Sequence, residues 1–547
     1  MSGRNGAPGA ADPIGAGANR SGSNEAAGRI REQIIYGKLA AINLHAGERM
    51  QRIARSPLIA ESRRFAVAVL TPDVRLAHQI QFEVEHLYAL RESVRSALDF
   101  FAYDIAEGDV IITADAYGGG TRGQTLTMAM PLFVEGELML FPAIRAQMSD
   151  LGGEIPGGFH PLAHEQWQES MRLTPVKLYV GGKLQRDVFR FLMTNSRTAE
   201  WLGADLAAMH ACCQEMQRSL LELLGQYGQT AVGQAADAMI AHTEAEAKRF
   251  LPRHGAAAGG RQGTAALPAA CGGAQIAVTA AWAGEQLVLD FAGTDAQLAA
   301  PYNCTAAMTQ SIAAASALAG GLDELPLNEG LLAALAFKLP QGSLVSPQFP
   351  AATALSGHVT AHAIAAAVTQ ALRSADESAN RGEAGEPHPA IHGGGPWAML
   401  YQPVGSAKVT PLRIEPGFAQ VHGGWGPSAL FGAGRLLSAE ELESGYGFRL
   451  ERRERQTDGS MQVELHILQG KWEYQAFPYG EDSVLIDSGS SVKQQEDGGT
   501  DNMQDGQQGV QEEQEDASGG PVLTSGDRIR LHYAGEAKAE EGEGHDN

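Results

Sequence analysis

Short apolar runs alternate with long amphipathic stretches over most of this chain, and this alternation narrows the folds that it can adopt. Residues 65–70 and 126–134 are mostly apolar and have the length of buried strands. Between residues 202 and 220, and again between 232 and 250, apolar side chains recur every three or four residues, which predicts two long helices. Because strands and helices are both predicted, the sequence indicates a mixed α/β (α+β) fold with several lobes. We find no internal repeat.

Composition divides the 547-residue chain into five parts. A Gly/Ala-rich stretch, 253–274, is the best candidate for a linker between an N-terminal lobe, 29–252, and a C-terminal lobe, 275–487. Residues 1–28 are rich in Gly, Ala, Ser and Asn, and residues 488–547 are rich in Gln, Glu, Asp and Gly. Both compositions predict mostly disordered ends, because neither offers enough apolar surface to form a core, although a short strand-like segment, 527–533, interrupts the second.

The overall charge and the targeting signals bear on the class of partner. A formal net charge of -23 repels phosphate backbones, so we predict no nucleic-acid partner. No run of about eighteen apolar residues is present, which predicts no membrane span. The first 28 residues lack the apolar core of a secretory signal, and the four cysteines form no Cys-x-x-Cys pair. We therefore expect a cytoplasmic protein with reduced thiols.

Two short motifs could bind a nucleotide or a metal ion, and both are weak. Residues 118–125 resemble a phosphate-binding loop, but Gln124 replaces the lysine and a predicted strand follows where a helix is needed. His358 and His362 lie four residues apart on a predicted helix, a spacing that an Ala-rich helix can carry by chance. The residues alone predict no nucleotide site and leave the function open.

A series of short blocks gives a more specific signal. Residues 114–121 read Ala-Asp-Ala-Tyr-Gly-Gly-Gly-Thr, similar to the motif Asn-Asp-Pro-Tyr-x-Gly-Gly-Thr of the hydantoinase B / oxoprolinase family. Other blocks follow in the family's order, at residues 53–57, 150–153, 165–169, 172–178, 195–198, 290–295, 326–330, 340–350 and 423–426. Each block is short, but the ordered set covers roughly residues 30–470 and resembles this family.

The resemblance implies a hydantoinase B-like fold and a role in an ATP-dependent complex. Members are subunits of N-methylhydantoinases, 5-oxoprolinases, lactamases and acetone- or acetophenone-type carboxylases. ATP is held by a hydantoinase A-type subunit, which phosphorylates the substrate oxygen, and the B-type chain acts on the activated species, often at a bound metal. We therefore expect no cofactor on this chain and ATP on a partner subunit. The expected partners are an A-type subunit, possibly a second B-type subunit, and a small-molecule substrate.

The chain departs from the family at the positions that supply metal ligands. Aligned on the family's blocks, these positions read Arg64, His86, Arg122, Thr125, and Gln147 or Met148. Only His86 matches the family. An arginine keeps its proton and cannot bind a metal ion, and two guanidinium groups repel a divalent cation. We therefore predict that this chain binds no metal.

Two interpretations of this departure stay open. In the first, the chain is catalytic, and Arg64 and Arg122 replace the ion's charge to hold a phosphorylated or carboxylate substrate. His86, Asp115 and Asp150 are then the acid/base candidates, although turn carboxylates and a core histidine would give the same residues. In the second, the chain is a non-catalytic scaffold or regulatory paralogue of an active complex.

Overall fold

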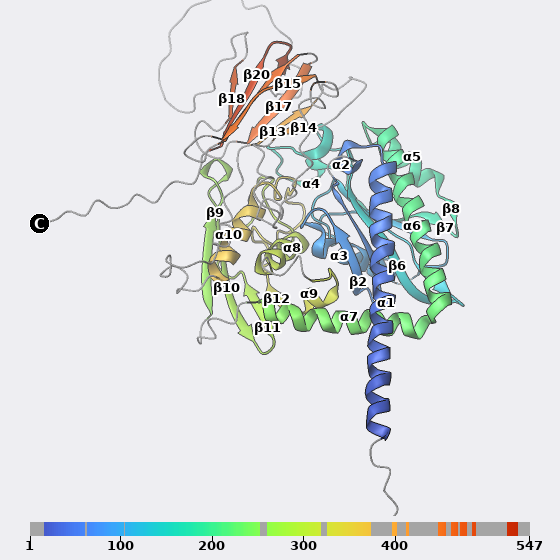
Figure 1. The fold of residues 1–547 in the computed structure, drawn as a ribbon. Helices are drawn as coiled ribbons and strands as arrows, with labels where there is room; N and C mark the ends of the chain where they lie inside the picture. Colours follow the sequence, from blue (N-terminus) through green and yellow to red (C-terminus); the bar gives the residue numbers. More distant parts are fainter. Residues whose placement is uncertain are drawn as a thin grey trace, which may run out of the picture.

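The architecture comes from a computed structural model, which describes residues 16–60, 63–102, 104–251, 260–318 and 325–372 and short segments between 397 and 533. An N-terminal lobe and a C-terminal lobe lie side by side, and further strands lie at one end of the molecule (Figure 1). The fold is mixed α/β, as the sequence predicts. Among the described residues, no helix is both long and apolar enough to cross a bilayer.

The N-terminal lobe is built on an eight-stranded antiparallel sheet with the order β2-β1-β6-β4-β3-β7-β8, in which β5 also pairs with β6. The strands are β1 (Phe65–Leu70), β2 (Leu76–Gln81), β3 (Val110–Ala114), β4 (Thr125–Ala129), β5 (Leu132–Val134), β6 (Glu137–Gln147), β7 (Leu173–Val180) and β8 (Lys183–Leu184).

Strand β1 shows why a continuous apolar run was needed here. Phe65, Val67 and Val69 belong to a core shared with helix α1 (Ala16–Ile53). The alternate residues, Ala66 and Ala68, belong to a second core shared with helix α3 (His86–Phe100). Because side chains alternate between the two faces of a strand, a sheet that is covered on both faces requires apolar residues at every position.

Helices cover this sheet and continue toward the C-terminal lobe. They are α2 (Pro57–Ala60), α4 (Gln166–Glu169), α5 (Arg186–Thr194), α6 (Ala199–Tyr227) and α7 (Gln229–Phe250), with a 3-10 turn η1 (Pro156–Gly158). The sequence predicts that Gly225 ends α6, but the helix passes through it and ends at Tyr227, followed by the C-cap residue Gly228, whose φ is 85°. Helix α1 begins at Ala16, so residues 16–28 of the predicted disordered arm are helical.

The C-terminal lobe contains a four-stranded sheet with the order β12-β11-β10-β9. Its elements are β9 (Arg261–Ala266), η2 (Ala269–Cys271), β10 (Gln275–Ala283), β11 (Gln286–Asp290), α8 (Ala306–Ala317), α9 (Glu329–Ala333), β12 (Leu335–Lys338) and α10 (Thr360–Leu372). Strand β9 lies within the segment predicted as a linker. A side chain at Gly263 would meet the Ala367 carbonyl of α10 at 2.0 Å, so this glycine serves close packing of strand on helix.

Eight further strands form two four-stranded sheets, ordered β14-β13-β17-β19 and β15-β16-β20-β18. They are β13 (Trp397–Tyr401), β14 (Leu412–Ile414), β15 (Phe448–Arg455), β16 (Met461–Ile467), β17 (Lys471–Phe477), β18 (Val484–Asp487), β19 (Val522–Thr524) and β20 (Arg528–Tyr533). Strands β19 and β20 lie inside the predicted disordered tail. The block at residues 423–426 lies outside the described residues.

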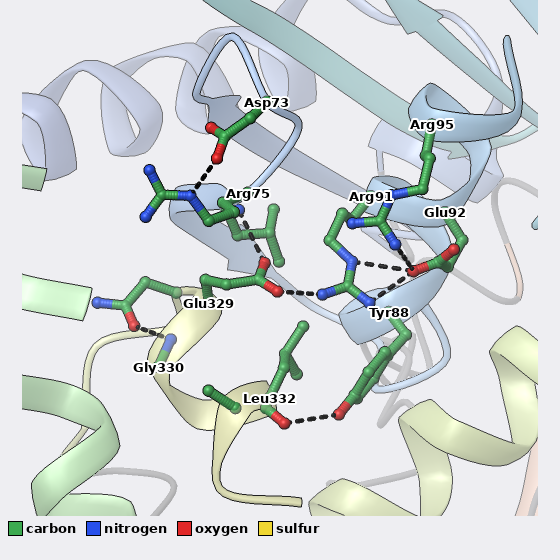
Figure 2. A network of polar contacts seen from close by, with 12 residues as sticks. Asp73, Arg75, Tyr88, Arg91, Glu92, Arg95, Glu329, Gly330 and Leu332 are labelled. Atoms are coloured by element: carbon green, nitrogen blue, oxygen red, sulfur yellow. Dashed lines mark hydrogen bonds and ion pairs between the residues drawn. The ribbon is translucent and has the colours of Figure 1, made fainter. Parts of the chain in front are cut away.

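The two lobes share one core and a set of ion pairs. Apolar residues of α3, α8 and α10 form a single buried cluster that crosses the boundary between the lobes. Figure 2 shows the polar part of this boundary, where Glu329 of α9 pairs with Arg91 of α3 and accepts the Leu76 amide hydrogen at 3.0 Å. Tyr88 donates its hydroxyl hydrogen to the Leu332 carbonyl at 3.4 Å.

Candidate functional site

One end of the N-terminal sheet brings together most of the positions that the sequence singles out. Arg64 directly precedes β1, and Gln147 ends β6, whose Ala146 pairs with Phe65. Thr125 opens β4 and pairs with Gln147. His86 opens α3, shortly after β2 ends beside Ala66. Antiparallel pairing therefore places these positions at the same end of neighbouring strands.

A buried network of charged and amide groups fills this end. Arg64 Nη1 donates to Gln147 Oε1 at 3.0 Å, and Arg64 Nε lies 3.4 Å from Glu83 Oε1. Arg122 Nη2 donates to both carboxylate oxygens of Glu85, at 2.6 and 2.7 Å. His86 Nε2 lies 3.6 Å from Glu83 Oε2. Together with Arg145, these buried residues are called the Arg122 cluster below: Arg64, Glu83, Glu85, His86, Arg122, Arg145 and Gln147.

The charge states in the cluster follow from burial and from the pairing. Burial, the largest single effect, would raise the pKa of Glu85, but the charge and hydrogen bonds of Arg122 act together with the charges of neighbouring groups to hold that pKa well below its ordinary value. Burial lowers the pKa of His86 to about 3, so the imidazole is neutral at physiological pH. Burial also lowers the pKa of Arg145 to about 10, which still leaves that guanidinium charged.

Arg145 lies on β6 and was not anticipated from the sequence. Its side chain is 1 % exposed, and it donates to three hydroxyl oxygens in place of a carboxylate. The acceptors are Ser93 at 3.0 Å, Thr127 at 2.7 Å and Thr121 at 3.0 Å. The hydroxyls accept from Nη1 and Nη2 without neutralising the charge, and Nε has no acceptor among the described residues.

Glu169 is a second residue that sequence reasoning did not single out. The carboxylate accepts the backbone N–H of Thr353 at 2.9 Å and that of Ala354 at 2.7 Å, so it joins α4 to a loop of the C-terminal lobe. Burial raises the pKa of Glu169 to about 8, against the lowering effects of these N–H groups and of the Arg122 charge. Glu169 lies in the family-like block 165–169, but nothing in a single sequence shows that an acid there is buried.

The two aspartates proposed as acid/base candidates lie in separate ion pairs. Asp115 is 3.0 Å from Arg172 and accepts the Tyr117 amide hydrogen at 3.0 Å. Asp150 accepts from the Arg197 backbone at 2.6 Å and from its guanidinium at 3.1 Å. Both carboxylates hold local turns and arginines, and neither is paired with an arginine of the Arg122 cluster in these contacts.

Several polar atoms in and beside the cluster make no hydrogen bond within the described part of the chain. They include Arg122 Nε and Nη1, Arg145 Nε, both ring nitrogens of His86, Thr125 Oγ1, and the side-chain amide of Gln166. The Phe159 ring lies over Arg122, with 5.6 Å from the guanidinium carbon to the ring centroid. A side chain at Gly357, from the C-terminal lobe, would lie 3.8 Å from Arg122 Nη1. Unused donors therefore lie where the two lobes meet.

Comparison with known proteins assigns this chain to a family. The sequence model of the family Hydantoinase B/oxoprolinase matches residues 29–460. The chain belongs to this family. The blocks that resemble it in the sequence thus reflect true membership.

Relatives and a solved structure agree with this assignment. The chain is 36% identical to the beta chain of the caprolactamase of Pseudomonas jessenii over 26% of its length. It is 26% identical to the B component of a putative D-/L-hydantoinase of Pseudomonas sp. strain NS671 over 63% of its length. These alignments span 25% and 61% of the two relatives, so the chain matches only part of each.

The fold likeness is more extensive than the sequence alignments. The crystal structure of the ATP-dependent caprolactamase from Pseudomonas jessenii matches with a TM-score of 0.73 at 22% identity. That match covers 92% of this chain and 90% of the other chain. It confirms the hydantoinase B-like fold that the resemblance implied.

The residues that this family member places at the expected metal position do not fit a divalent cation. Glu83, Glu85 and His86 could offer three ligand atoms within 4.8 Å of one another. However, Arg122 holds both oxygens of Glu85, and Arg64 lies beside Glu83. An ion among them would face three guanidinium groups at short range with only two carboxylates, which is unfavourable in a low-dielectric interior.

Proposed function

We propose that this chain is the B-type subunit of an ATP-dependent complex that opens a cyclic amide or imide, or carries out a related carboxylation. A hydantoinase A-type partner supplies the ATP chemistry. The observation that carries the proposal is the match over nearly the whole chain to a caprolactamase described as ATP-dependent. Family membership over residues 29–460 supports it. We expect the complex to work in the cytoplasm.

Within this function, the Arg122 cluster is the proposed substrate-facing site. It lies at the meeting of the two lobes and contains charged groups together with donors that have no acceptor among the described residues. Buried polar groups without partners are costly to folding, and a protein retains them where they serve binding or chemistry. Arg122 would hold an oxyanion of the activated substrate, and neutral His86 would exchange a proton with it.

A second candidate function is a non-catalytic scaffold in the same complex. The observation that favours it is the burial of the cluster, since Arg64, Arg122 and His86 are each 6 % exposed or less. Internal pairing of Arg64 with Glu83 and of Arg122 with Glu85 would suit a purely structural role.

Co-purification with A-type and B-type partners separates the two candidates. The assay measures ring opening that depends on ATP, with this chain plus an A-type subunit and then with a second B-type chain added. Activity with the A-type subunit alone, lost in Arg122→Ala at unchanged complex assembly, supports the catalytic function. Activity only with the second B-type chain, unaffected by Arg122→Ala, supports the scaffold. If neither combination binds this chain, the proposed function is wrong.

A further inference from the structure

The Arg122 cluster carries more positive than negative charge. The guanidinium groups of Arg64, Arg122 and Arg145 are all buried, and two carboxylates, Glu83 and Glu85, lie among them. Unpaired charge in a dry interior is expensive, so a cluster of this composition favours an additional anion.

Glu169 is a further acid whose charge acts on Arg122, and it does not fully supply that anion. Its carboxylate is already directed at the backbone N–H groups of Thr353 and Ala354. Burial raises its pKa to about 8, so Glu169 is largely protonated at neutral pH. With Glu169 directed at these N–H groups, the three guanidinium groups of the cluster lie among two carboxylates, Glu83 and Glu85.

The hydrogen-bonding capacity of Arg122 points the same way. Its Nη2 is used by Glu85, whereas Nε and Nη1, which carry three of the five guanidinium N–H groups, have no acceptor among the described residues. The side chain is 3 % exposed, so bulk water does not satisfy them. A buried guanidinium with unused donors is suited to bind carboxylate or phosphate oxygens.

Small residues and one aromatic ring surround the Glu85–Arg122 pair. Gly357 presents no side chain toward the pair, and a Cβ there would lie 3.1 Å from Met308 Cε and 3.4 Å from Glu85 Oε2. Phe159 covers the guanidinium and follows Gly157 and Gly158, which have φ values of 76° and 73°. Movement of the Phe159 ring would uncover this face of Arg122, and a turn of two glycines gives the backbone freedom for such a movement.

We propose that the Arg122 cluster is an oxyanion site, in which Nε–H and Nη1–H groups of Arg122 bind a carboxylate or phosphate group at the position where the family resemblance implies a metal site. The inference rests on the proposed function for its biological ligand, a carboxylate or phosphorylated intermediate. The binding itself requires neither ATP nor a partner subunit. A fixed guanidinium group would thus attract the substrate oxygens in this chain, a role that the family resemblance assigns to a metal cation.

Calorimetric titration of the full-length chain tests the proposal. The probes are inorganic phosphate, acetate and MnCl2, each at an ionic strength held constant with NaCl. We expect one phosphate or one acetate per chain and no saturable binding of Mn²⁺. A preference for phosphate or for acetate identifies which oxyanion the site takes.

The variants are chosen so that folding does not decide the result. Arg122→Gln alone leaves Glu85 buried without its partner, so the double variant Glu85→Gln with Arg122→Gln removes the pair as a neutral unit. We expect it to weaken oxyanion binding at least tenfold. Arg172→Gln is the matched control, because Arg172 pairs with Asp115 outside the cluster, and binding should be unchanged.

Three results would overturn the proposal. The first is an absence of saturable binding of both phosphate and acetate to the wild-type chain. The second is equal binding by the folded double variant. The third is stoichiometric binding of Mn²⁺. A complex that opens its substrate while its isolated B-type chain fails these titrations would leave the proposed function intact and reject the oxyanion site alone.

Discussion

Two groups of arginines and glutamates involve α3, and they differ in how completely they are paired. At one, called the Glu329 network below, Arg91 pairs with Glu329 and Glu92, and Arg95 pairs with Glu92 (Figure 2). Its outer members are partly exposed, with side-chain exposures of 40% for Arg95 and 24% for Glu92.

The Arg122 cluster, in contrast, is buried throughout and has donors without acceptors among the described residues. Water completes the solvation of the exposed side chains in the Glu329 network. Its ion pairs therefore require no further ligand, and their role is to hold the two lobes together. The charged groups of the Arg122 cluster are buried, so water cannot complete their solvation in this way. The comparison suggests that the first network serves stability and the second serves binding, and each prediction below can contradict that division.

The largest effect is expected for Arg122→Gln. The change leaves the Glu85 carboxylate buried without its counter-charge, which should lower the free energy of unfolding by about 3–5 kcal/mol. Chemical denaturation followed by circular dichroism measures this.

The matched control is a double-mutant cycle with Glu85→Gln. The double variant should recover most of the lost stability, because two neutral amides can bond to each other. A double variant as unstable as the single one would show that Arg122 stabilises through packing on Phe159 instead.

Glu329→Gln should be less damaging, at about 1–3 kcal/mol. The change weakens the pair with Arg91, but the amide oxygen can still accept from the Leu76 amide, and Arg91 retains Glu92. The same denaturation experiment compares the two variants directly. A loss equal to that of Arg122→Gln would remove the distinction between the two groups of ion pairs.

The pH dependence of stability should show the contribution of Glu169. Its folded-state pKa of about 8 is above its ordinary value of 4.5, so the protonated form is favoured by folding. The corresponding stability is fully present below pH 4.5 and is lost as the pH rises through about 8. Between about pH 6 and 7, wild type should lose about 1 kcal/mol that Glu169→Gln does not lose.

Parallel unfolding curves of wild type and Glu169→Gln at these two pH values make the comparison. Identical pH dependence in both proteins would mean that Glu169 is ionised in the folded state. The Arg122 cluster would then be balanced in charge, and the oxyanion site would lose one of its supports.

Much of this fold could be predicted from sequence, and the reasons for success and failure are physical. The strand at 65–70 was predictable because burial on both faces leaves an unbroken apolar run. The end of α6 was misplaced, because a glycine within a helix costs only about 1 kcal/mol and packing overrides it, whereas the positive φ of Gly228 cannot be read from composition.

The site was predictable only in part. The blocks that resemble the family marked Arg64, Arg122 and Gln147, and the structure brings these together at the sheet end. Their acidic partners were missed, since the pairing of Glu83 and Glu85 depends on the register of β1 with β2 and on the start of α3. Single-sequence reasoning carries no information on such long-range neighbours.

The smallest effect is expected at the outer edge of the Glu329 network. Arg95→Ala removes a pair that is 3.1 Å long but 40% exposed at the arginine, so solvent and salt already screen it. We expect a loss of at most about 0.5 kcal/mol that disappears at high salt. A larger loss, insensitive to salt, would mean that Arg95 holds Glu92 in place for Arg91. The stabilising role of the Glu329 network would then extend to the surface of α3, and exposure alone would not separate strong pairs from weak ones in this protein.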